Sequence, residues 1–132
     1  MIARLIARVD LSRLIRFGLV GLSGTLVNLA VVHVLFGTLH WPAVIASPVA
    51  VEASVVNNFL WNNWWTFRQR SVSLARFIRF NLASLGGLAI TAAVFAALVD
   101  LLGWHYLLAD LIAIGAATGW NFAASVLWTW AR

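Results

Sequence analysis

The stretch RFGLVGLSGTLVNLAVVHVLFG, residues 16–37, decides the fold of this 132-residue chain. It spans the roughly 20 residues that a helix needs to cross the hydrocarbon core of a membrane. Its only Asp, Glu, Lys or Arg residue is Arg16, at its first position. Similar stretches follow at about residues 43–67, 79–102 and 107–130. The sequence therefore predicts an all-α membrane protein with four transmembrane helices. Short outer turns make antiparallel hairpins of spans 1 and 2 and of spans 3 and 4.

The composition of the chain excludes a water-soluble domain. Hydrophobic residues make up 63% of the chain and charged residues 10%, whereas a soluble domain carries about 25% charged residues. A soluble fold built from these residues would have an almost wholly apolar surface. The net charge of +5 suggests a nucleic-acid partner at first sight. However, the arginines lie at the ends of apolar stretches rather than along one polar face, so we expect membrane lipids and no nucleic acid as partners.

The nine basic residues are all arginines, and they lie in three short segments. These segments are residues 4–16, residues 68–79 and the last residue of the chain. Because basic residues concentrate in cytoplasmic loops, we expect both termini and the central loop on the cytoplasmic face of the membrane. Apolar residues recur at helical spacing over about residues 2–13, which predicts a short amphipathic helix in the membrane interface. A frayed tail is the alternative for that segment.

The second hairpin repeats the first at a fixed offset of 63 residues. Residues 13–67 align with residues 76–130 without a gap, and 19 of the 55 positions are identical. Each repeat unit contains two spans, so both units enter the membrane from the same side. We therefore expect two tandem parallel-repeat hairpins within a single domain of residues 1–132, related by an axis along the membrane normal.

Polar side chains within the predicted spans are the candidate site, and Glu52 is the strongest of them. A carboxylate in hydrocarbon costs about 2.5–3.5 kcal/mol, so it should face the bundle interior, a wet cavity or a partner. Its depth depends on where span 2 begins. A helix that starts at Ser47–Pro48 leaves Glu52 near the outer interface, and a helix that starts at Ala43 places it deeper. A structural role, capping or satisfying a neighbouring helix, is the alternative.

Asparagines are concentrated after Glu52, with four of them between residues 57 and 63. Amides donate and accept hydrogen bonds, which suits sugar hydroxyls and phosphate oxygens; the alternative is hydrogen bonding between helices. Arginines at the span ends lie where lipid phosphates lie, and they either bind phosphate or only set the topology. The candidate substrate-binding residues are Glu52, Asn28, Asn57, Asn58, Asn62, Asn63 and Asn121. The candidate phosphate-binding residues are Arg16, Arg68 and Arg79.

Catalytic patterns are missing from the sequence. It contains no cysteine, and we find no nucleophile–base pair, metal-ligand cluster or phosphate-cradling glycine loop with its lysine. We therefore expect that the chain is not an enzyme and that it takes no metal and no cofactor.

Several short motifs carry a family resemblance. They are RFGLVG at residues 16–21, Glu52 followed by NFLWNNWWTF at residues 58–67, and NF at residues 121–122 before WTW at residues 128–130. Together they resemble the GtrA-like family of small four-span membrane proteins, from about Leu14 to Trp130. That family often has a basic residue where this chain has Asn63. If that group contacts phosphate in the relatives, Arg68 or Arg79 would serve here.

The resemblance implies a role in cell-surface polysaccharide synthesis. It implies translocation, or flipping, of a polyprenyl-phosphate-linked monosaccharide across the bacterial inner membrane, or assistance to a membrane glycosyltransferase. Two further hypotheses are a small proton-coupled exporter that uses Glu52 and a non-transporting adaptor for a glycosyltransferase. Four spans make a small pathway, so a homodimer or a partner protein is plausible.

Overall fold

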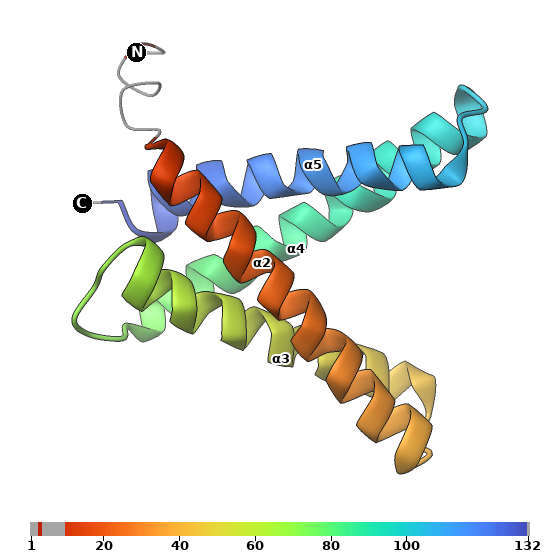
Figure 1. Cartoon of the computed structure of the whole chain (residues 1–132), viewed down its shortest axis with the longest axis horizontal. Coiled ribbons are helices and arrows are strands. Elements are labelled where there is room, and N and C mark those ends of the chain that lie inside the picture. Colours follow the sequence, from red (N-terminus) through yellow and green to blue (C-terminus); the bar gives the residue numbers. More distant parts are fainter. Residues whose placement is uncertain (1–2, 4–9, 132) are drawn as a thin grey trace. The chain divides into compact units, whose positions relative to one another are not determined.

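The structure, a computed structural model, describes residue 3 and residues 10–131, and these residues form helices and turns without a strand. Four helical spans are long and apolar enough to cross a membrane: Leu11–Thr38, Ala43–Thr66, Leu74–Leu101 and Tyr106–Thr129 (Figure 1). The protein is therefore an all-α, four-span membrane protein, as the sequence predicts. The interfacial helix expected at residues 2–13 lies largely outside the described residues, and residues 11–13 begin the first span.

Each span is an α-helix that continues into a short π-helical segment. The first hairpin contains α2 (Leu11–Val32), η1 (His33–Thr38), α3 (Ala43–Trp61) and η2 (Asn62–Thr66). The second contains α4 (Leu74–Ala96), η3 (Ala97–Leu101), α5 (Tyr106–Ala124) and η4 (Ser125–Thr129). A π-helical turn shifts the hydrogen bonding from i−4 to i−5 and often occurs at functional sites.

The chain folds as two compact units, the first ending at Val72 and the second beginning at Ser73. In the first unit α2 packs against α3, and in the second α4 packs against α5. The α-helices of the two units begin in equivalent places, and their ends agree to within one residue. The starts of α4 and α5 lie 63 residues after those of α2 and α3, and η4 lies 63 residues after η2. The backbone therefore has the same offset as the sequence alignment.

Side chains just before three of the helices fix where those helices begin. Asp10 accepts a hydrogen bond from the backbone N–H of Ser12 at 3.0 Å, which starts α2 five residues before Arg16. Ser73 caps α4, and His105 caps α5 through its Nδ1. Each cap satisfies a backbone N–H that lacks a partner within its helix.

The two outer turns share one unusual backbone conformation. His40 has φ 56° and Gly103 has φ 66°, and these residues are equivalent in the alignment. The left-handed region is free of steric cost for glycine but costs other residues about 1 kcal/mol or more. The outer turn is therefore tight in both units, although only the second has the residue best suited to it.

Small side chains bring the two helices of each hairpin together. Ala46 and Ala50 lie one turn apart on α3 and are almost fully buried, as are their counterparts Ala109 and Ala113 on α5. Such small residues allow helix backbones to approach closely in a membrane, where packing replaces the hydrophobic effect as the driving force. The large apolar side chains are mostly on the surface, Val44 for example with 80% exposure, as expected of helices that face lipid.

Candidate functional site

An arginine-lined cavity of about 180 Å³ lies in the first hairpin, at the end where α2 begins and η2 ends. Its lining residues are Asp10, Ser12, Arg13, Arg16, Thr66, Phe67 and Arg68. Three guanidinium groups thus share one cavity with a single carboxylate. Guanidinium groups match the geometry of phosphate oxygens, so the cavity suits an anionic phosphate group.

The guanidinium of Arg16 is positioned by the end of η2. Its Nη1 donates a hydrogen bond to the backbone oxygen of Trp65 at 3.4 Å, and the group lies 5.6 Å from the centre of the Trp65 ring. Arg13 lies in the same way over Phe67, at 5.9 Å. Backbone oxygens at the end of a helix lack partners and carry partial negative charge, so cations are favourable there.

The third arginine of the cavity enters from the segment after η2. Arg68 has φ 49°, in the left-handed region, so the chain reverses just past Phe67. Two backbone hydrogen bonds hold this reversal. The N–H of Phe67 donates to the backbone oxygen of Asn62 at 2.8 Å, and the N–H of Gln69 donates to the backbone oxygen of Asn63 at 2.7 Å. The π-helical end of span 2 thus positions Arg68 so that it lines the same cavity as Arg13 and Arg16.

Two of the four clustered asparagines support this cavity from behind. Asn62 is 1% exposed, and its Oδ1 accepts a hydrogen bond at 2.8 Å from Thr66 Oγ1, the side chain that lines the cavity. Asn63 is fully buried and donates from Nδ2 to the backbone oxygen of Ser71 at 3.1 Å. Through this bond Asn63 holds the loop that carries Arg68.

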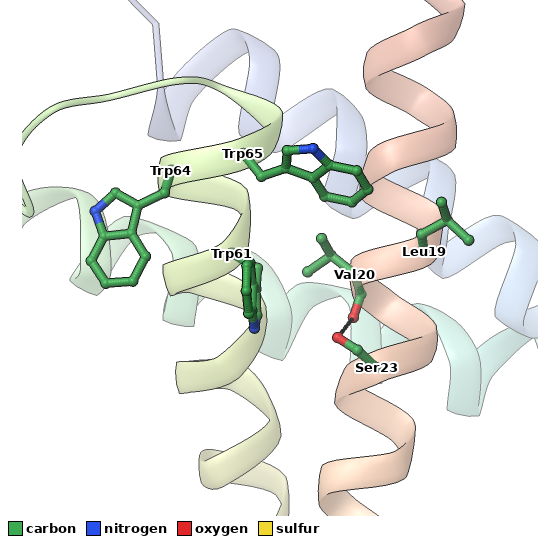
Figure 2. A pocket seen from close by; sticks show the side chains of 6 residues that line it. All are labelled: Leu19, Val20, Ser23, Trp61, Trp64 and Trp65. Carbon is green, nitrogen blue, oxygen red and sulfur yellow. Dashed lines mark hydrogen bonds between the residues drawn. The ribbon is translucent and has the colours of Figure 1, made fainter.

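An apolar groove with a volume of about 450 Å³ lies between the two helices of the same hairpin (Figure 2). Leu19, Val20 and Ser23 of α2 form one wall, and the indoles of Trp61, Trp64 and Trp65 rise from α3 and η2. The volume falls within the range of about 300–1,000 Å³ that is common for small-molecule sites.

A small polar pair lies at the wall of the groove. Ser23 Oγ donates to the backbone oxygen of Val20 at 2.6 Å, as the dashed line in Figure 2 marks. The Ser23 Oγ in turn accepts a hydrogen bond from Asn57 Nδ2 at 3.0 Å. Asn57 therefore joins α3 to α2, and its partner Ser23 is the one polar side chain among the six that line the groove.

Trp65 connects the groove to the arginine-lined cavity. Its indole lines the groove, while its backbone oxygen and ring hold the Arg16 guanidinium that lines the cavity. A long apolar surface thus leads to a cationic end within one hairpin. This arrangement fits an amphiphile with an anionic head, since the tail would contact indoles and the head would meet guanidinium groups.

Other predicted ligand residues lie in contacts between helices. The Asn58 amide packs directly on Gly24 of α2, where a Cβ atom would overlap it. Asn121 packs in the equivalent way on Gly87 of α4, with its Oδ1 2.6 Å from the position of an added Cβ. Each asparagine therefore fills the space that the facing glycine leaves open.

Glu52 occupies the deeper of its two predicted positions. The helix begins at Ala43 after Pro42, and Pro48 lies inside it, so Glu52 is the tenth residue of α3. At a rise of about 1.5 Å per residue, its Cα lies roughly 13 Å along the helix. The side chain of Glu52 is exposed and lines neither of the two cavities described above.

The remaining candidates, Asn28 and Arg79, line neither of these cavities. Asn28 is half-buried on α2, and Arg79 is exposed on α4, in the second unit. The structure therefore brings together Arg16 and Arg68 of the predicted phosphate group. It adds residues that the sequence analysis did not select: Arg13, Ser23, Trp61, Trp64 and Trp65.

Buried polar atoms without partners distinguish the second hairpin. Asn121 Oδ1, Ser125 Oγ and Thr129 Oγ1 make no hydrogen bond within the described part of the chain. They lie four residues apart, on one face of α5 and η4. Their counterparts in the first hairpin are Asn58, Asn62 and Thr66, of which Asn62 and Thr66 bond each other.

Comparison with known proteins places the chain in a family. The family model for the GtrA/DPMS transmembrane domain matches residues 16–130. A dolichol-phosphate mannosyltransferase of Pyrococcus furiosus is 39% identical over 124 residues. That match covers 92% of this chain and 35% of the relative, so the chain spans about a third of the relative's length. With its four spans and a match over nearly its whole length, the chain belongs to the GtrA/DPMS transmembrane-domain family.

Proposed function

We propose that the chain binds a polyprenyl-phosphate-linked monosaccharide in the membrane and carries its head group across, for cell-surface glycan synthesis. The observation that carries this proposal is the contact between Trp65, which lines the apolar groove, and Arg16, which lines the arginine-lined cavity. The proposed lipid has the same order of parts, with a long apolar tail joined to a phosphate and then to a sugar.

The comparisons support the lipid class. The relative is named for mannose transfer and for dolichol phosphate, which is a polyprenyl phosphate. Because this chain matches about a third of that protein and its family model describes a transmembrane domain, we assign the lipid to this chain and the transfer reaction to another part of the relative. The chain itself is then a binding and transport protein rather than an enzyme.

Different side chains bind the different parts of the lipid in this proposal. Arg13, Arg16 and Arg68 bind the phosphate, because guanidinium groups pair with its oxygens. Once the head group leaves the arginine-lined cavity and moves along the groove during translocation, the Asn57 amide and the Ser23 hydroxyl at the groove wall replace water on sugar hydroxyls. Glu52, about 13 Å along α3, offers a carboxylate acceptor further into the bilayer.

The proposed setting is the bacterial inner membrane. The arginine-lined cavity faces the cytoplasm, where lipid-linked sugars are made, and both chain termini lie on that side according to the distribution of basic residues. The two hairpins act as tandem repeats within one domain, with the 63-residue offset of their helices as support.

Movement of the lipid in vesicles tests this function. Purified protein in vesicles with a polyprenyl-phosphate sugar on the inner leaflet should make that sugar accessible to an external periodate or lectin probe. The double variant Arg16→Gln/Arg68→Gln should slow this movement about ten-fold or more, since the phosphate loses two cationic partners. Arg70→Gln is the control because Arg70 does not line the cavity. A wild-type protein that moves no lipid-linked sugar would exclude translocation.

A membrane adaptor for a glycosyltransferase is the second candidate. The relative, named as a mannosyltransferase, is about three times as long as the segment it shares with this chain. A separate chain with this fold could therefore hold a partner enzyme at its lipid substrate. Co-purification of a glycosyltransferase, together with absence of lipid movement by the chain alone, would favour this function. A proton-coupled exporter of cations is disfavoured, because three arginines would repel such cargo.

A further inference from the structure

Among the differences between the two hairpins is one pair of facing positions at which both members of the pair change. The first hairpin has Ser23 on α2 and Asn57 on α3. The equivalent positions of the second hairpin, 63 residues later, are Gly86 on α4 and Trp120 on α5. A small polar pair in one hairpin thus corresponds to a glycine and an indole in the other.

The indole of Trp120 takes over the space and the bonding of the serine. Trp120 Nε1 donates to the backbone oxygen of Ala83 at 3.0 Å. Ala83 is the counterpart of Val20, whose backbone oxygen accepts the hydrogen bond from Ser23 in the first hairpin. A Cβ atom at Gly86 would lie 2.8 Å from Trp120 Nε1, so even an alanine there would crowd the ring.

This exchange falls on the wall of the apolar groove. Val20 and Ser23 line the groove of the first hairpin. Their counterparts Ala83 and Gly86 instead lie against the nitrogen-bearing edge of the Trp120 indole. Two of the three groove tryptophans are also lost, because the counterparts of Trp61 and Trp64 are an alanine and a leucine.

We propose that the first hairpin alone is the lipid-binding half, and that Trp120 closes the equivalent surface of the second. The occupant is a polyprenyl phosphate, with its tail in the groove and its phosphate in the adjoining cavity. Charge complementarity argues for this occupant, because the groove ends at three arginines. The lipid's identity rests on the proposed function, whereas the choice of hairpin rests on the paired exchange.

A pair of reciprocal exchanges tests the inference. Ser23→Gly with Asn57→Trp gives the first hairpin the residues that close the second. Gly86→Ser with Trp120→Asn is the matched control, because it opens the second hairpin and leaves the first untouched. The probe is a polyprenyl phosphate with a photoreactive group in its tail, and cross-linked peptides are mapped by mass spectrometry.

Cross-linking of the wild type should map to the segment 19–65. In the Ser23→Gly/Asn57→Trp variant, the cross-linking yield should fall about ten-fold, equivalent to about 1.4 kcal/mol of binding. The control variant should keep the wild-type yield. Leu19→Trp is a second filling variant, since Leu19 is a half-exposed groove residue outside the Ser23–Asn57 pair. Its cross-linking should fall as well, so the test does not depend on one double variant folding.

Three results would overturn the inference. They are unchanged cross-linking in both filling variants, wild-type cross-links that map to residues 82–128, and equal competition by phosphatidylglycerol, which would make the occupant an ordinary phospholipid. Failure of the proposed function looks different. Cross-linking to the first hairpin without movement of the sugar in vesicles would remove translocation and leave this inference in place.

Discussion

At the scale of single residues, the four asparagines of span 2 make different kinds of contact. Asn57 joins two helices, Asn58 fills the space over a glycine, and Asn62 and Asn63 hold the end of the span. The sequence shows that four amides are too many for a lipid-facing surface, but it does not separate ligand from packing roles. That separation depends on which side chain faces which, for example Ser23 opposite Asn57, and the sequence does not give these contacts.

Thr66 and Thr129 allow the value of one buried hydrogen bond to be measured. Thr66→Val should destabilise the protein by about 1–3 kcal/mol, because it leaves the buried Asn62 Oδ1 without its donor. Thr129→Val should be near neutral or stabilising, since the hydroxyl it removes has no partner in the described structure. Unfolding in detergent micelles gives both values, and equal losses would contradict this prediction.

Glu52 carries the residue-scale test of transport. Glu52→Gln should lower lipid movement at least about ten-fold, because an amide is a weaker acceptor than a carboxylate for sugar hydroxyls. Membrane insertion should be unchanged, as the variant is less costly to place in hydrocarbon. Asp110→Asn, only five residues into α5, is the control. Transport at the wild-type rate would remove Glu52 from the site.

At the scale of helices, the sequence predicts the spans well and their ends less well. The sequence predicts that span 2 runs from Ala43 to about residue 67, and in the structure it is Ala43–Thr66. Span 1 begins earlier than its predicted start at Arg16, because the Asp10 cap extends α2 by five residues. The π-helical ends were not predicted, since hydropathy and periodicity do not distinguish i−5 from i−4 hydrogen bonding over a single turn.

Helix contact predicts opposite effects for two glycines of α2. Gly24→Ala should cost about 1–3 kcal/mol of stability, because the added Cβ would overlap the Asn58 amide and displace it or the helix. Gly21→Ala should be neutral or stabilising by up to about 1 kcal/mol, since no atom lies within 4 Å of its Cβ position and alanine favours the helix. Thermal unfolding in detergent separates them, and a larger loss at Gly21 would refute this helix contact.

At the scale of the whole molecule, composition and hydropathy are sufficient for the architecture. An all-α protein with four membrane spans follows from apolar stretches of the right length, and the structure has four such helices. The paired exchange of Ser23–Asn57 for Gly86–Trp120 is readable from the aligned repeat, although only half of it, Asn57 against Trp120, stands out before the contacts are known. Asparagine against tryptophan is conspicuous, whereas serine against glycine is an ordinary difference in a small-residue helix face.

The topology of the chain can be measured directly because it has no native cysteine. Single cysteines at Leu39 or Leu102, in the outer turns, should react with a membrane-impermeant maleimide added to intact cells or spheroplasts. A cysteine at Ser71, in the central loop, should react only after permeabilisation, since the distribution of arginines predicts a cytoplasmic position for that loop. Labelling of Ser71→Cys in intact cells would reverse the orientation and remove the cytoplasmic entry of the lipid.

The short outer turns have a consequence for biogenesis. Only residues 39–42 separate η1 from α3, so the two spans of the first hairpin meet with a small loss of chain entropy. We expect them to leave the translocon as a pair while the ribosome is still making the second hairpin. Asn57 would then reach the lipid with Ser23 already beside it, and its amide would never be exposed alone to acyl chains.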